Sequence, residues 1–63
     1  MNLSQLVKKT RTALGMTQIE LSQKSGVSQS AISKIESGKL ERPSFSIVMN
    51  LHKALKFKLE EVK

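Results

Sequence analysis

The segment from Thr17 to Ser28 constrains the fold most, because it marks the start of one helix, its end and the start of the next. Thr17 and Glu20 form a T-x-x-E capping box, which is typical of a helix N-terminus. Gly26 is suited to a left-handed helix end, and Ser28 follows closely as a good N-cap. We therefore predict two short helices joined by a tight turn.

Helices are also predicted on both sides of this unit. Asn2 and Gln5 form a second capping box, and the helix that they begin is expected to end at Gly15. A later helix is expected to begin at Ser44, directly after Pro43. Its apolar residues recur at helical spacing and are expected to face inward: Ile47, Val48, Leu51 and Leu55. The predicted fold class is all-α.

Length and composition favour a small DNA-binding domain. With 63 residues and no cysteine, residues 1–63 are expected to form a single domain, without disulfides or thiolate metal sites, in the cytoplasm. The net charge of +6 suits a polyanionic partner. Two phenylalanines are the only aromatic residues, which is too few for stacking on single strands, so double-stranded DNA is favoured. No segment is apolar and long enough to insert into a membrane.

The helix expected over residues 28–37 has two distinct faces. At the helical period, its polar side chains fall on one continuous face: Gln29, Ser30, Ser33, Lys34 and Ser37. Ala31, Ile32 and Ile35 fall on the opposite face, and Gly38 is expected to end the helix. A helix with a small apolar face and an opposite face of short polar side chains can pack on a core and present its polar face to a partner.

The stretch TQIELSQKSGVSQSAISKIESGK resembles the phage repressor and Cro helix-turn-helix family of XRE-type regulators, and the likeness extends over most of the chain. The resemblance implies a compact five-helix domain. In such a domain the second helix lies across the DNA backbone and the third, residues 28–37, enters the major groove. No cofactor is implied.

The resemblance also assigns roles to individual residues. Base contacts are expected from Gln29, Ser30, Ser33 and Lys34, because glutamine can bond adenine on two atoms and lysine can reach guanine or a phosphate. Phosphate contacts are expected from the helix starts and the following loop: Thr17, Gln18, Ser28, Ser37, Lys39 and Arg42. The alternatives are an ordinary solvated helix face, simple N-caps and a solvated charge run.

An ion pair between Arg11 and Glu36 is also implied by the resemblance, and its expected role is to orient the reading helix. The loop departs from close relatives, because Glu41 and Ser44 occupy places where a basic residue is common. Backbone affinity is therefore expected to be weaker, or to depend more on Lys8 and Lys9.

The C-terminal segment is ambiguous. Lys56 stands where many relatives have glycine, so it must take up a left-handed cap or avoid it. Residues 56–60 alternate as an edge strand would, whereas residues 59–62 suit a final helical turn, which we favour. In either form Phe57 or Leu59 is expected to supply a symmetric dimer contact.

These observations predict a homodimeric repressor that occupies a palindromic operator. The alternative is the antitoxin of a toxin pair, whose main partner is a protein toxin and whose DNA binding serves autoregulation. The sequence offers no basis for an enzyme or a metal site, because His52 is the single histidine and there is no aspartate or cysteine.

Overall fold

The computed structural model of the chain describes residues 2–57, and this part of the chain is helical, without strands. Its four helices are α1 (Leu3–Ala13), α2 (Gln18–Ser25), α3 (Gln29–Glu36) and α4 (Phe45–Leu55). The predicted all-α class and the four predicted helix positions are thus confirmed. The predicted fifth segment falls largely outside the described residues.

Both predicted capping boxes are present. At α1 the Asn2 side chain accepts from the Gln5 amide at 2.9 Å, and the Asn2 amide donates to the Gln5 side chain at 3.3 Å. At α2 the Glu20 amide donates to Thr17 Oγ1 at 3.1 Å, and the Thr17 amide donates to Glu20 Oε1 at 3.0 Å. Each box satisfies two amides that have no acceptor one turn earlier in the helix.

The turn between α2 and α3 depends on Gly26. This residue caps α2 in the left-handed conformation, with φ at 79°, and its amide donates to the Ser22 carbonyl at 2.9 Å. Val27 follows and is buried, and the Ser28 hydroxyl then accepts from the Ala31 amide at 3.1 Å as the N-cap of α3. A residue with a Cβ would be strained at Gly26, because positive φ is costly for L-residues.

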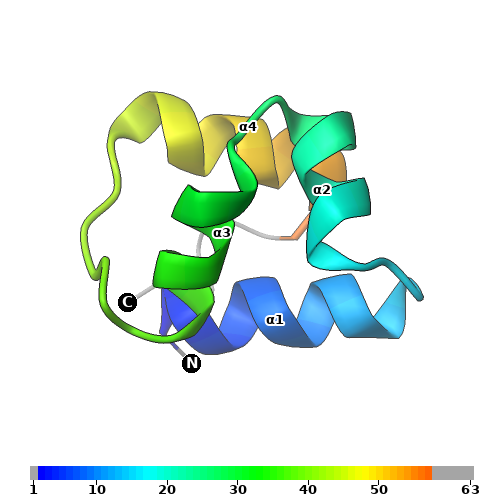
Figure 1. The fold of residues 1–63 in the computed structure, drawn as a ribbon, viewed down its shortest axis with the longest axis horizontal. Helices are drawn as coiled ribbons and strands as arrows, with labels where there is room; N and C mark the ends of the chain where they lie inside the picture. Colours follow the sequence, from blue (N-terminus) through cyan, green and yellow to red (C-terminus); the bar gives the residue numbers. More distant parts are fainter. Residues whose placement is uncertain (1, 58–63) are drawn as a thin grey trace.

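The four helices enclose one hydrophobic core. In Figure 1, α1 and α4 lie along opposite sides of the view, with α3 between them and α2 closing one end. α3 packs on α1 and α2, and α4 packs on the same two helices. Every helix contributes to the core, which consists of Leu3, Leu6, Val7, Leu21, Val27, Ile32, Ile35, Leu51, Ala54, Leu55 and Phe57. The predicted inward residues Ile47 and Val48 are partly buried and pack against it.

The C-terminal end of α4 is closed by Lys56 in the left-handed conformation, with φ at 58°. Its amide donates to the His52 carbonyl at 2.6 Å. This turn directs Phe57 into the core, where it is 5% exposed and lies edge-on to the His52 ring, with 5.5 Å between the ring centroids. A left-handed lysine is therefore tolerated because the chain reversal buries an aromatic side chain.

The position of Phe57 corrects one expectation. Phe57 was expected to offer a dimer contact, but it has almost no exposed surface because it fills the core at the end of α4. Leu59, the other expected dimer contact, and the helix or strand alternatives for residues 58–63 lie outside the described residues.

Among residues 2–57, none of the helices has the length and apolar character needed to span a bilayer.

Replacing Lys56 by glycine is expected to stabilise the fold. The substitution removes a left-handed conformation that costs an L-residue roughly 1–2 kcal/mol, and the greater chain entropy of unfolded glycine offsets part of this. We expect a net gain of about 1 kcal/mol, which in a domain of this size raises Tm by about 5 °C. Thermal and urea unfolding followed by circular dichroism measure the change.

Lys53→Gly is the matched control, because Lys53 is exposed in the last turn of the same helix and its φ is not positive. There the substitution is expected to destabilise the fold by about 1 kcal/mol. A loss of stability in both variants would show that the left-handed conformation at Lys56 is not a source of strain.

Candidate nucleic-acid interface

The outer face of α3 is polar and exposed. All the side chains that the sequence placed on this face are exposed: Gln29, Ser30, Ser33, Lys34 and Ser37. Ile32 and Ile35, on the opposite face, are 0% exposed. Because α3 is anchored by buried β-branched residues, its outer side chains are presented from a fixed backbone.

The C-terminal end of α3 is held by an ion pair with α1. Arg11 Nε lies 2.7 Å from Glu36 Oε2, and Arg11 Nη2 donates to Glu36 Oε1 at 3.0 Å. The two side chains are 12% and 5% exposed, so the guanidinium and carboxylate meet in two parallel bonds largely out of water. The hydrogen bond to Glu36 raises the pKa of Arg11. The pair that the family resemblance implied is thus present in the structure.

Three further hydrogen bonds converge on this pair. Arg11 Nη1 donates to the Met16 carbonyl at 2.6 Å, and Gln18 Nε2 donates to Glu36 Oε1 at 3.2 Å. The Ser4 hydroxyl donates to the Glu36 carbonyl at 2.7 Å. The last residue of α3 is therefore bonded to both ends of α1 and to the start of α2. We refer to Ser4, Arg11, Gln18 and Glu36 as the Glu36 network.

Sequence reasoning did not find most of the Glu36 network. The Arg11–Glu36 pair came from the family resemblance, Gln18 was expected only to contact phosphate, and Ser4 was not singled out. Their separations along the chain follow no helical period, since each pair joins different helices. No local signal in the sequence could have shown these contacts.

At the start of α2, the side chains of Thr17 and Gln18 make different contacts. The Thr17 hydroxyl is used as a cap, whereas Gln18 is half-buried against Glu36. The capping box leaves the amides of Gln18 and Ile19 without an acceptor one turn earlier in the helix. Glu20 places a negative charge at the start of α2, and this charge lowers the attraction of that helix end for a phosphate.

The two serines that bound α3 also make local bonds. Ser28 Oγ accepts from the Ala31 amide, and Ser37 Oγ donates to the Lys34 carbonyl at 3.1 Å. Both residues are exposed. Since a hydroxyl has one donor and two acceptor positions, Ser28 still has its proton to donate to a phosphate oxygen, whereas Ser37 has already donated its own.

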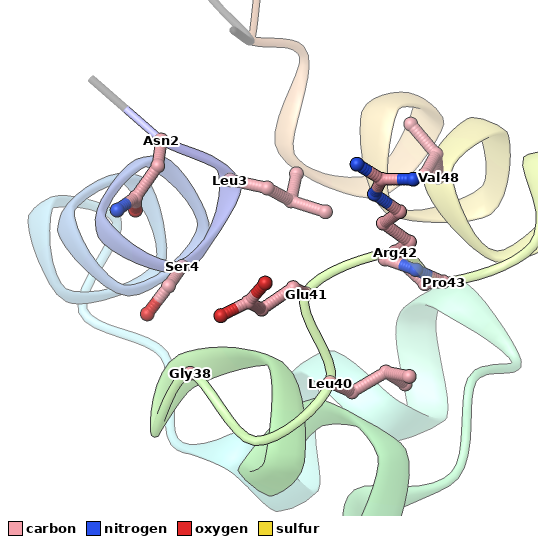
Figure 2. A pocket seen from close by; sticks show the side chains of 9 residues that line it. All are labelled: Asn2, Leu3, Ser4, Gly38, Leu40, Glu41, Arg42, Pro43 and Val48. Carbon is pink, nitrogen blue, oxygen red and sulfur yellow. The ribbon is translucent and has the colours of Figure 1, made fainter.

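The loop after α3 carries Lys39 and Arg42, both of which are exposed. A groove of about 730 Å³ lies between the start of α1, this loop and α4, and Figure 2 shows the side chains that line it. The Arg42 side chain extends away from α3 along Val48, and the Glu41 carboxylate points between Leu3 and Ser4. Contact between Arg42 and a partner on the outer face of α3 would therefore require its side chain to rotate.

Within residues 2–57, His, Cys, Asp and Glu side chains do not gather in groups of three or more that could hold a metal ion. His52 lies on α4 with Nδ1 buried and without a hydrogen-bond partner in this part of the chain. It packs against Phe57 on the inner side of the bundle.

A family model described as helix-turn-helix matches residues 7–62, which is most of the chain. The match includes all of α2, α3 and α4 and the turns between them. No solved structure matches the chain significantly.

Replacing Arg11 by methionine is expected to destabilise the fold by about 3 kcal/mol, because it leaves the Glu36 carboxylate buried without a counter-ion. Adding Glu36→Leu in the same chain removes the stranded charge and is expected to restore most of the loss. Urea unfolding of the single and double variants measures both effects.

Lys9→Met is the control, since Lys9 is exposed on the same helix and should change stability by less than about 0.5 kcal/mol. If Arg11→Met matched this control, the pair would contribute nothing to the fold. If the double variant were as unstable as Arg11→Met alone, the contribution of Arg11 to stability would come from its packing and not from its charge.

Proposed function

We infer the function of this chain from the Cro/C1-like, XRE-type helix-turn-helix family, to which it belongs. In this proposal residues 1–63 form one domain, which represses transcription as a homodimer on a palindromic operator. Membership in this family makes the chain a DNA-binding regulator of transcription. The observation that carries the finer proposal is the exposed polar face of α3, which is backed by Ile32 and Ile35 with no exposed surface. The proposed location is the cytoplasm.

The proposed base contacts come from the outer face of α3. Gln29 and Ser30 lie in its first turn, the end that reaches base edges when such a helix enters the major groove. A glutamine amide can bond both N6 and N7 of adenine, so Gln29 is proposed to set most of the base preference. Lys34 lies one turn later and can reach guanine or a phosphate, and Ser33 contributes a less selective contact.

The proposed phosphate contacts flank this face. On one side are Thr17 and Gln18 at the start of α2, with Ser28 at the start of α3. On the other side are Ser37, Lys39 and Arg42, at the end of α3 and in the loop that follows. The net charge of +6 supports attraction to a duplex, and the negative charges of Glu20 and Glu41 reduce it locally.

The proposal of two copies follows from the length of the reading helix. α3 has 8 residues, so it is about 12 Å long and can contact only a few base pairs in one major groove. Such a short site recurs often in any genome. A two-fold dimer reads two such half-sites, about 34 Å apart, and so doubles the length of DNA sequence that is recognised. Leu59 is the proposed residue of the dimer contact. Occupying the operator would block transcription.

Selection from random duplex DNA, combined with the sedimentation mass of the complex, tests this proposal. We expect a palindromic site whose half-sites are centred about 10 base pairs apart, bound by two copies. Enrichment of an asymmetric site bound by one copy would remove the homodimer from the proposal. If no sequence were enriched although duplex DNA was bound, sequence-specific regulation would be the wrong conclusion.

Two substitutions separate base reading from backbone binding. Gln29→Ala is expected to reduce discrimination at one position of each half-site by about 1–3 kcal/mol and to leave the dependence on salt unchanged. Lys39→Ala is expected to weaken binding to every duplex similarly and to reduce the slope of log K against log salt by about 0.9 for each half-site. Fluorescence anisotropy titrations over a range of salt concentrations measure both.

Lys53→Ala is the control for charge, because Lys53 is exposed on α4, away from the outer face of α3. It should change binding much less than Lys39→Ala does. An unaltered base preference in Gln29→Ala would show that α3 does not read the operator through this residue.

A further inference from the structure

The side of α4 that faces away from the core also carries apolar side chains. α4 lies along one side of the molecule (Figure 1). Taking about 100° per residue from the buried Leu51, its inward residues lie within roughly 60° of that position. Phe45, Met49 and Lys53 lie at roughly 120°, 160° and 200°, with Ser46 beside them. We refer to Phe45, Ser46, Met49 and Lys53 as the outer face of α4.

The exposure of Phe45 indicates that this face contacts a partner. Phe45 is 78% exposed, whereas the other large apolar residues that are exposed within residues 2–57, Leu14 and Ile19, are 54% exposed each. Met49 lies one turn after Phe45 and is half-buried, and in the described part of the chain it is not among the side chains that pack against the core. An exposed aromatic ring beside a flexible methionine is typical of a protein-binding surface.

The charges at the outer face of α4 are basic. α4 contains Lys53 and no acidic residue, and Lys56 directly after the helix is exposed as well. Glu41 precedes α4 in the sequence, but its carboxylate is directed between Leu3 and Ser4 at the start of α1 (Figure 2). A protein that binds here is therefore expected to carry acidic residues, because complementary charge favours association.

We propose that the outer face of α4 binds an acidic amphipathic helix of a partner protein. Phe45, Met49 and Lys53 follow one another at intervals of four residues, so they form a ridge about 12 Å long. Such a ridge packs into the groove between two rows of side chains on another helix. Apolar residues of the partner cover Phe45 and Met49, and its carboxylates lie beside Lys53 and Lys56. The inference does not depend on how α3 reads DNA.

Other occupants fit this face less well. A second copy of the chain would bring basic side chains to basic side chains and would supply no acidic residue from α4. A DNA backbone would attract Lys53, but it offers no apolar surface to cover Phe45 and Met49. A bilayer surface is bound by a longer row of apolar anchors than these two residues provide.

A synthetic helical peptide of about 18 residues tests the proposal, with leucines at helical spacing on one face and glutamates beside them. Titrated into the ¹⁵N-labelled full chain, it is expected to shift the backbone amide signals of Phe45, Met49 and Lys53 and to leave those of the outer face of α3 unchanged. A scrambled peptide of the same composition, and a peptide with lysine in place of each glutamate, should bind at least about tenfold more weakly.

Two substitutions locate the contact. Phe45→Ala is expected to weaken binding of the acidic peptide about tenfold, and Lys53→Glu about fivefold, with a larger effect of Lys53→Glu at low salt. The matched controls are Ile19→Ala and Lys24→Glu, an exposed apolar residue and an exposed lysine of α2, which should leave affinity for the peptide unchanged. All four side chains are exposed, so the variants are expected to fold, and circular dichroism checks this.

The proposal is overturned if the acidic peptide does not shift the amides of α4, or if the scrambled peptide binds equally well. Three results would assign the outer face of α4 to another occupant and overturn it too. Self-association of the free chain that Phe45→Ala abolishes would indicate a second copy. Displacement of the peptide by a duplex of about 20 base pairs would indicate DNA. Binding to vesicles of anionic phospholipid that Phe45→Ala abolishes would indicate a membrane. Base reading by α3 is tested separately, by Gln29→Ala.

Discussion

The bidentate ion pair between Arg11 and Glu36 is the interaction on which the arrangement of the helices depends. It joins α1 to the last residue of α3, and Arg11 also bonds the carbonyl of Met16 just before α2. Removing two charges from water is costly, so such a pair adds little to stability by itself. Because these bonds join residues of α1 and α3 to the segment before α2, the pair is a constraint on how the three helices are oriented.

This constraint matters because the domain is small. With 63 residues the chain can bury only a modest core, and α2 and α3 have 8 residues each. Helices of this length are marginal by themselves and depend on packing. Ile32 and Ile35 fasten α3 to the core, and Glu36 fixes its end. The outer face of α3 is thereby presented from an anchored backbone.

Local signals in the sequence predicted the helices well, because each signal acts over three or four residues. The capping boxes of Asn2 and Thr17, and the glycine turn at Gly26, are satisfied by their near neighbours. The polar face of α3 followed from the helical period. Lys56 shows where such rules fail: a lysine is a poor left-handed cap, yet it takes this conformation because Phe57 is then buried.

The sequence by itself therefore determined where helices begin and end, which side of α3 is polar, and that the chain is basic. Only the tertiary structure decided what the side chains between helices do: that Gln18 bonds Glu36, that Ser4 bonds the end of α3, and that Phe57 lies inside. The physical reason is the range of the interactions. Caps and periods are set within a turn of helix, whereas these contacts join residues far apart in the chain, which meet only when the core has formed.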